Sequence, residues 1–221
     1  MVLLIHHPVS PYCRKIRLMM AEKKRLFILK EEEPWKPSED VFKLNPAGDL
    51  PIYLNDGNVI IGNYAITEYL EETAADIPLI FGDALKKAEI RRLCEWFDVK
   101  FYREVYRNIV YEKVHKRFAN GLAPDSKILK VGLNNLNYHL EYMDWLLERR
   151  KNLADDQLSL ADFTAAAHLS VVDYLGDVPW DEFKNVKIWY SRLKSRPSFK
   201  DILKDSIRGI LPAKHYANLD F

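Results

Sequence analysis

The sequence lacks long hydrophobic runs, has few cysteines and carries no excess of either charge. No run of about 18 apolar residues occurs, so we expect no membrane insertion. Lys and Arg total 33 against 32 for Asp and Glu, and this balance argues against general binding to nucleic acid. Cys13 and Cys94 lie far apart. This sparse use favours a reducing cytoplasm, although a disulfide stays open at this point. The N-terminus lacks the basic region of a signal peptide, so we expect a cytoplasmic protein.

Motifs for metal and nucleotide sites are also missing. The six histidines are scattered, and neither HExxH nor a Cys/His spacing typical of zinc sites occurs. His6 and His7 are adjacent at the end of a predicted strand, where neighbouring side chains face opposite ways. No P-loop or GxGxxG sequence is present. We therefore expect no metal and no nucleotide cofactor.

What is present falls into two halves with different patterns. Residues 1–76 alternate short apolar runs with amphipathic segments, and Asp56-Gly57 marks a hairpin turn. Ser10-Pro11 opens the first helix, since Ser is a favoured N-cap and Pro is tolerated at the first helical position. The order is strand, helix, strand, helix, strand, strand, helix, which matches a thioredoxin-like domain. The expected elements are strands near 2–5, 26–29, 50–54 and 59–61 and helices from Ser10 and over 38–44 and 64–73.

The second half shows only helical spacing. Apolar positions recur at helical intervals over residues 84–119 and 126–150, separated by Gly121 and Pro124. We predict an all-helical domain over 84–206, joined through a short linker and followed by a tail at 207–221. Within it, Ser159 and Asp162 have the spacing of a capping box, in which each side chain bonds the other residue's N–H. We assign this pair to folding.

Three segments together resemble the glutathione S-transferase superfamily. The stretch NPAGDLPIYLNDGNVIIGNYAITEYL at 45–70 resembles its glutathione-binding segment, Ser159–Asp162 its SxAD cap, and the stretch WYSRLKSRPSF at 189–199 its WYxRLxxRPS segment. The resemblance covers nearly the whole chain. It implies a thioredoxin-like domain followed by an all-α domain, assembled as a homodimer.

The resemblance also implies where glutathione would bind. Ser10 takes the place that faces the glutathione sulfur in serine- and cysteine-type members, and a hydroxyl at a helix N-terminus favours a thiolate. Tyr12 and Cys13 are weaker candidates, and Ser10 acting only as a helix cap is the alternative. Leu50 and Pro51 correspond to the residue that pairs with the cysteinyl backbone and to the cis-proline.

The γ-glutamyl end of glutathione lacks its usual partners. Family members place an acidic residue or Gln and then Ser or Thr at the start of the third helix, whereas this chain has Gly62-Asn63. Gly62 has no side chain, while Asn63 can still donate to a carboxylate. Hydrogen bonds to charged groups contribute about 1.5–3 kcal/mol each, so losing one or two predicts roughly 10- to 10³-fold weaker binding. Glutathione is therefore expected at most as a weak ligand.

Two features suggest a protein partner instead. Glu31–Glu33 and Trp35 place an acidic run beside an aromatic side chain of a kind enriched at interfaces. The tail is richer in apolar groups than a disordered segment, so it packs on the body or binds a partner. The tail residues that we expect at a partner are His215, Tyr216, Leu219, Asp220 and Phe221.

The ending HYANLDF, with Gly62-Asn63, resembles a branch of the superfamily found in alphaproteobacteria. That branch includes a dimeric, non-catalytic partner of the tubulin-like division protein FtsZ. The leading hypothesis is a homodimeric adaptor that binds FtsZ filaments through its tail and a face of the helical domain. The alternatives are a glutathione S-transferase that acts on small electrophiles with Ser10 as thiol activator, and a small-molecule binding module that kept the pocket.

Overall fold

The computed structural model describes residues 1–219 and begins with a four-stranded mixed sheet in the order β2-β1-β3-β4. The central strand β1 (Val2–His6) pairs in parallel with β2 (Phe27–Glu31) and antiparallel with β3 (Ile52–Asn55). β4 (Asn58–Ile61) pairs antiparallel with β3 and forms the other edge. The sheet and the helices that follow confirm the predicted thioredoxin-like fold.

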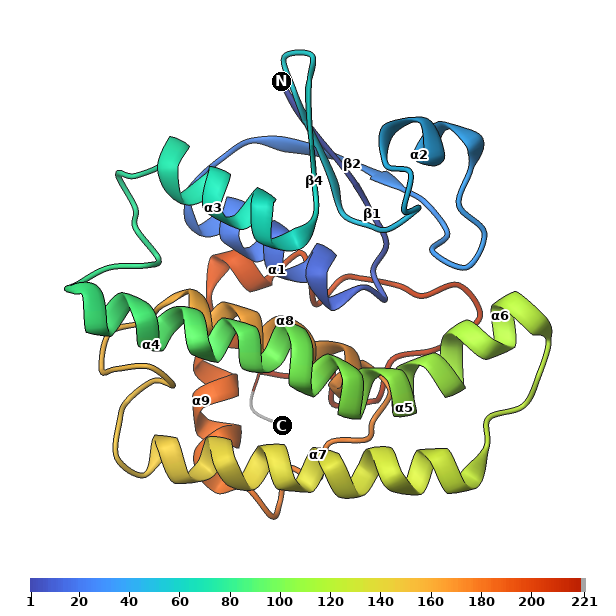
Figure 1. The fold of residues 1–221 in the computed structure, drawn as a ribbon. Helices are drawn as coiled ribbons and strands as arrows, with labels where there is room; N and C mark the ends of the chain where they lie inside the picture. Colours follow the sequence, from blue (N-terminus) through green and yellow to red (C-terminus); the bar gives the residue numbers. More distant parts are fainter. Residues whose placement is uncertain (220–221) are drawn as a thin grey trace.

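Three helices accompany this sheet (Figure 1). α1 (Pro11–Glu22) and α3 (Asn63–Thr73) lie between the sheet and the helical half of the molecule, whereas α2 (Glu39–Leu44) lies beside the strands at the upper right of the view, away from the helical half. The third strand, expected from residue 50, begins at Ile52. The shift has a simple cause, because Pro51 has no N–H to donate to a strand ladder.

The helical half begins with a continuous helical run from residue 84 to residue 120, which bends between α5 (Arg107–Val110) and α6 (Lys116–Asn120) (Figure 1). Gly121 ends it in a left-handed conformation with φ 66°. The single α-helix expected here contains two stretches of π-helix, which have wider turns than an α-helix. The run consists of α4 (Ala84–Glu95), η1 (Trp96–Tyr106), α5 (Arg107–Val110), η2 (Tyr111–His115) and α6 (Lys116–Asn120).

The remaining helices pack around a buried centre. α8 (Leu160–Tyr174) is buried along its whole length and packs against α1, α4 and η1. α7 (Ser126–Leu147) packs on the outer side of the long helical run, and α9 (Lys184–Lys194) contacts α7 and α8. A short 3₁₀ turn, η3 (Pro197–Phe199), then contacts α1. Within residues 1–219, no helix has both the length and the apolar character needed to cross a membrane.

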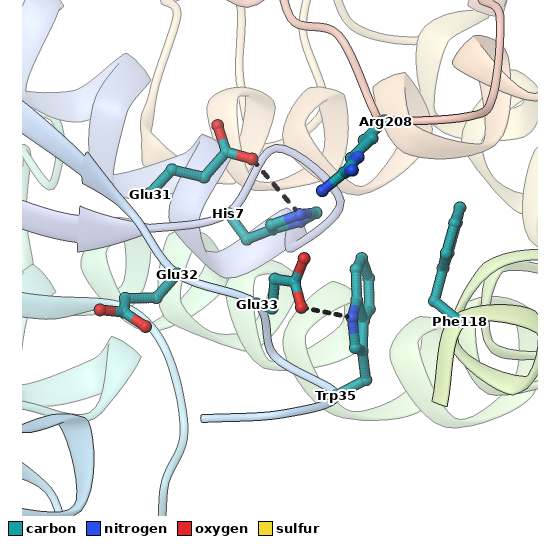
Figure 2. A pocket seen from close by; sticks show the side chains of 7 residues that line it. All are labelled: His7, Glu31, Glu32, Glu33, Trp35, Phe118 and Arg208. Atoms are coloured by element: carbon teal, nitrogen blue, oxygen red, sulfur yellow. Dashed lines mark hydrogen bonds and ion pairs between the residues drawn. The ribbon is translucent and has the colours of Figure 1, made fainter. Parts of the chain in front are cut away.

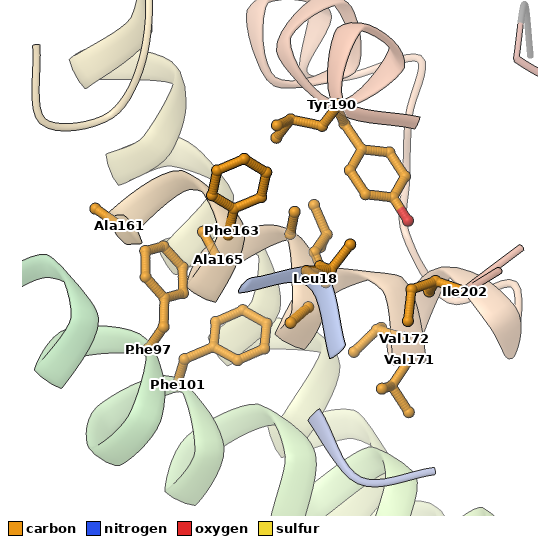
Figure 3. Close-up of a cluster of buried hydrophobic side chains, with 14 of the residues drawn as sticks. Leu18, Phe97, Phe101, Ala161, Phe163, Ala165, Val171, Val172, Tyr190 and Ile202 are labelled. Carbon is orange, nitrogen blue, oxygen red and sulfur yellow. The ribbon is translucent and has the colours of Figure 1, made fainter. Parts of the chain in front are cut away.

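One hydrophobic core joins the two halves. Leu18 of α1 belongs to the same buried cluster as Phe97 and Phe101 of η1 and Val171 of α8 (Figure 3). The capping box predicted at the start of α8 is present, and the Asp162 carboxylate accepts the Ser159 N–H at 2.9 Å. Because α1 and α8 share this core, the seam between the two halves is rigid enough to hold a site.

Candidate functional site

A cavity of about 610 Å³ lies at this seam, where the glutathione site was expected. Its thioredoxin-like wall comes from the start of α1, the loop before β3 and the start of α3, and its helical wall comes from η1, α5 and η2. The lining residues include Ser10, Tyr12, Asp49, Leu50, Pro51, Gly62, Asn63, Tyr102, Tyr106, Arg107 and His115. The structure thus brings Ser10, Leu50, Pro51 and Asn63 to one cavity, while the role of each stays a prediction.

Ser10 is the N-cap of α1, and its Oγ accepts the Cys13 N–H at 3.3 Å. The side chain lines the cavity although the residue is only 8% exposed. Its position therefore serves the helix cap and leaves the hydroxyl at the cavity wall. The Leu50–Pro51 peptide bond at the same wall is cis, as the family resemblance implied.

Cys13 is not a catalytic candidate, because its side chain is fully buried among Ile5, Val41 and Leu50. Burial raises the pKa of its thiol to about 11, so the thiol stays protonated near neutral pH. Cys94 is also buried, and neither cysteine forms a disulfide. Sequence spacing alone gave no sign that Cys13 points into the sheet-side core rather than into the cavity.

Tyr12 is turned toward the helical domain. Its hydroxyl donates to the backbone carbonyl of Asp98 at 2.7 Å, and burial raises the pKa of the phenol above its usual value. The ring lies 4.8 Å from Tyr102, which stacks on Tyr106 at 4.6 Å and 14°. These three rings give the cavity an aromatic wall, and the phenol of Tyr12 is not placed to activate a thiol.

Asn63 is the residue on which the ligand question depends. Its amide nitrogen Nδ2 donates to Oδ2 of Asp98 at 2.8 Å, while its Oδ1 is buried without a hydrogen-bond partner. The orientation of the amide follows from chemistry, since a carboxylate accepts hydrogen bonds and cannot donate them. Gly62 is the N-cap of α3 and offers no side-chain bond to the helix. One of the two N–H groups of the amide that was expected to bind a γ-glutamyl carboxylate is therefore already used within the chain.

Asp98 was missed by the sequence reasoning and organises this part of the site. The same oxygen that bonds Asn63 accepts Lys15 Nζ at 2.6 Å, and the other oxygen lies 3.0 Å from His168 Nε2. Burial by itself raises the pKa of Asp98, but Lys15 and His168 outweigh burial and lower it to about 2. No sequence signal identified this cluster, because Lys15 and Asp98 are 83 residues apart and each looked like an ordinary polar position on a helix.

Trp35 lies at a second cavity, of about 580 Å³, beside Glu31–Glu33. Its ring is partly buried and stacks on Phe118 of α6 at 5.0 Å and 22°, and its Nε1 donates to Glu33 at 3.2 Å (Figure 2). Part of the ring surface is thus used to join the loop after β2 to the helical domain. Contact with a partner through Trp35 stays a prediction.

The structure corrects the expectation for Tyr216 in the tail. This residue is 1% exposed, accepts from Arg14 Nη1 at 2.9 Å and donates to the Ile202 carbonyl at 3.0 Å. It anchors the tail to the core and is not available to a partner. His215 bonds Asp173 at 2.8 Å, whereas Leu219 is 41% exposed.

The predicted partner residues Asp220 and Phe221 lie outside the described residues.

Comparisons with known proteins agree with this geometry. Residues 9–73 match the family model of the glutathione S-transferase N-terminal domain, and residues 113–197 match that of the C-terminal domain. The chain is 44% identical over 220 residues to FtsZ-localized protein A of Caulobacter vibrioides, with 98% of this chain and 96% of that protein covered.

Two solved structures superpose on nearly the whole chain. One is a glutathione S-transferase from Rhodospirillum rubrum, with 46% identity, a TM-score of 0.97 and all of both chains covered. The other is FzlA from C. crescentus, with 43% identity, a TM-score of 0.96 and coverage of 100% of this chain and 99% of that one. The chain therefore belongs to the glutathione S-transferase superfamily.

Proposed function

We propose that this protein is a cytoplasmic adaptor that binds FtsZ and that its glutathione site is degenerate. The similarity to FtsZ-localized protein A over 98% of the chain supports the partner. The observation that carries the loss of glutathione binding is the bond from Asn63 Nδ2 to Asp98. This bond engages one N–H of the Asn63 amide and holds the side chain against Asp98, at the start of α3 where Gly62 supplies no side-chain donor.

The charges on glutathione make this site costly to fill. Its γ-glutamyl end carries an ammonium and a carboxylate, and both lose water on binding. Turning the Asn63 amide away from Asp98 toward glutathione would break their bond and leave a buried carboxylate with one donor fewer. Removing one partner from a buried polar pair costs about 1–3 kcal/mol, so the exchange gives little or no net gain. The hydrogen bond from Asn63 to Asp98 is therefore expected to be favoured over one from Asn63 to glutathione.

Calorimetric titration with glutathione tests whether the site is degenerate. We expect no saturation below about 1 mM, which corresponds to a binding free energy of about −4 kcal/mol. Asn63→Ser supplies the hydroxyl typical of the family and is expected to bind at least about tenfold more tightly, because one regained bond to a charged group contributes about 1.5–3 kcal/mol.

Asn63→Ala is the matched control, since it also releases Asp98 but adds no donor, and we expect no gain from it. Micromolar affinity of the unaltered protein would contradict the degenerate site. If the Ser and Ala variants gained equally in glutathione affinity, the missing hydroxyl would not be the cause of the weak binding.

The tail is the proposed FtsZ contact, and the structure shows where to cut it. Truncation after Asn218 keeps Tyr216 with its bonds to Arg14 and Ile202 but removes Leu219 and the two residues after it. Because the anchor remains, we expect a folded protein whose co-sedimentation with FtsZ polymers falls at least about tenfold in affinity, equivalent to about 1.4 kcal/mol. Circular dichroism and thermal unfolding check the fold.

Truncation before Tyr216 is a poorer test, because it leaves the Arg14 guanidinium buried with one partner fewer. Unchanged co-sedimentation of the Asn218 truncation would exclude the end of the tail as the contact. Loss of binding together with a lower unfolding temperature would show that the cut acted through the fold.

A homodimer is part of the same proposal. Large apolar side chains are exposed on α3, α4, η1 and α7, which is the usual mark of a protein interface when they gather on one face. They are Tyr64, Leu85, Val99, Tyr138 and Trp145. A second copy of the chain that packs on these helices would cover such side chains.

Ser10 supports a second candidate, a glutathione S-transferase. Its hydroxyl lines the cavity at the N-terminus of α1, where the helix dipole stabilises a thiolate. The titration above separates the two functions, because a transferase needs bound glutathione. Should glutathione bind, Ser10→Ala is expected to abolish turnover of a small electrophile.

A further inference from the structure

The cavity at Trp35 joins three parts of the chain that are far apart in sequence. His7 and Glu31–Glu33 come from the ends of β1 and β2, Phe118 comes from α6, and Arg208 comes from the tail (Figure 2). Its volume of about 580 Å³ falls in the range of about 300–1,000 Å³ that ligand pockets occupy. It is separate from the cavity at Ser10, and the two have no lining residue in common.

Negative charge dominates this cavity. Three carboxylates line it against one guanidinium, that of Arg208. Among the described residues, Arg208 makes no ion pair within 4.0 Å, although its side chain points into the cavity (Figure 2). The Glu31 carboxylate lies 3.6 Å from Nε2 of the neutral His7 imidazole, and its side chain is 57% exposed. Burial, followed by the charge of Asp205, raises the pKa of Glu31, whereas Arg17 acts in the opposite direction.

A buried hydrogen-bond donor also points into the cavity. His7 is 2% exposed, and its Nδ1 accepts the Val9 N–H at 3.1 Å, so the ring proton is on Nε2. Burial lowers the pKa of this imidazole to about 4, so the ring is neutral at pH 7. The 3.6 Å distance from Nε2 to Glu31 is longer than a hydrogen bond. Glu31 is therefore too far away to accept a full hydrogen bond from this N–H.

The aromatic wall is held in place. Trp35 stacks on Phe118 and is fixed by its bond to Glu33, and the ring of His7 makes a T-shaped contact with it at a centroid distance of 4.9 Å. A rigid indole beside carboxylates suits a cation, because the ring face attracts positive charge and a planar guanidinium stacks on it. An anion would meet the carboxylates of Glu31 and Glu33 there, while the Glu32 carboxylate is paired with Lys30 at 3.4 Å.

We propose that this cavity receives an arginine side chain from a peptide segment of the protein partner. The guanidinium lies against Trp35 and bonds Glu31 and Glu33, and the carbonyl of the same peptide accepts the His7 Nε2–H. An arginine within a peptide supplies both a second cation for the carboxylates and an acceptor for the His7 N–H. This inference rests on the proposed adaptor function and names the chemistry of the partner at one contact.

A small probe tests the cavity without FtsZ. N-acetyl-arginine N-methylamide is titrated into the full-length ¹⁵N-labelled protein, and the indole N–H resonance of Trp35, assigned with Trp35→Phe, is followed by NMR. We expect a saturable shift, a weaker one with the lysine analogue and none with the glutamate analogue. Glu31→Gln should weaken binding at least about tenfold, whereas Glu141→Gln on the surface of α7 should not.

Arg208→Ala is the variant that best tests whether the cavity binds a cation. Removing the competing guanidinium should strengthen binding of the arginine probe several-fold. Weaker binding in this variant, no shift with the arginine probe, or a larger shift with the glutamate probe would overturn the proposal. A normal circular dichroism spectrum of each variant shows that the comparison is between folded proteins.

Co-sedimentation with FtsZ then links the cavity to the partner. If the unaltered protein does not co-sediment, the adaptor function fails, and the probe titration still decides whether the cavity binds arginine. If it does co-sediment, Glu31→Gln is expected to lower the affinity at least about tenfold relative to Glu141→Gln. Equal co-sedimentation of the two variants would overturn the cavity's role in binding the partner.

Discussion

Acidification from pH 7 to pH 4 is expected to unfold this protein cooperatively, with uptake of several protons. Burial lowers the pKa of His6 to about 3 and those of His7, His115 and His139 to about 4. Burial also lowers the pKa of His168, which outweighs the opposite effect of Asp98. Each of these rings is therefore neutral in the folded protein at a pH where an exposed histidine is charged.

The direction of the effect follows from proton linkage. An unfolded histidine has a pKa of about 6.5, so between that value and the folded value the unfolded chain binds more protons. The stabilising contribution is fully present above about pH 6.5 and is lost as the pH falls toward 4. Each such histidine changes the free energy of unfolding by about 1.4 kcal/mol per pH unit, against a typical total of about 5–15 kcal/mol.

Urea unfolding at pH 7.5, 6.5, 5.5 and 4.5, followed by tryptophan fluorescence and circular dichroism, measures this effect. The slope of the unfolding free energy against pH gives the number of protons taken up. His139→Gln is a useful variant, because Gln can still accept the Trp96 indole N–H that His139 accepts at 3.0 Å. It is expected to reduce the uptake by about one proton. A free energy that stays constant between pH 6.5 and 4.5 would contradict the prediction.

Asp162→Ala is expected to destabilise the protein by at least about 4 kcal/mol, because it leaves several buried donors unpaired at once. Asp162 is fully buried, and its carboxylate accepts the N–H of Leu153 at 2.8 Å and the indole N–H of Trp189 at 3.0 Å. It also accepts the N–H and hydroxyl of Ser159 at 2.9 and 3.0 Å. For a chain of this size the thermal midpoint should fall by roughly 10 °C.

Ser159→Ala is the matched control for the cap alone. It removes one hydroxyl and keeps both the backbone bond to Asp162 and the links to Leu153 and Trp189, so we expect a loss of about 1 kcal/mol. Calorimetry or thermal circular dichroism measures both variants. If the two lowered the midpoint equally, the bonds to Leu153 and Trp189 would contribute little, and Asp162 would act only as a cap.

Much of the fold was predictable because its signals are local. The Asp56-Gly57 turn, the Ser10-Pro11 helix start and the Ser159–Asp162 cap each depend on residues within a few positions of one another, and the structure contains all three. The resemblance in residues 45–70 and 189–199 added the family. Two details were not predicted. The third strand begins at Ile52 rather than at residue 50, and η1 is π-helical, because ladder pairing and helix pitch depend on neighbours in space.

The candidate site was only partly predictable. Ser10, Leu50, Pro51 and Asn63 do line one cavity, since the family motif specifies local geometry. The roles expected for Cys13 and Tyr216 were wrong, because burial decides whether a thiol or a phenol is available.

By itself, then, the sequence determined the thioredoxin-like domain, the all-helical domain and the caps that begin their helices, since hydrophobic period and capping chemistry act over a few residues. Only the tertiary structure decided which polar groups are already paired. Asp98 accepts a hydrogen bond from the Asn63 amide because α3, α1 and η1 meet at the seam. Arg14 donates to the Tyr216 hydroxyl because the tail folds back onto α1. These bonds join residues far apart in sequence, and they settle what remains free to bind a ligand.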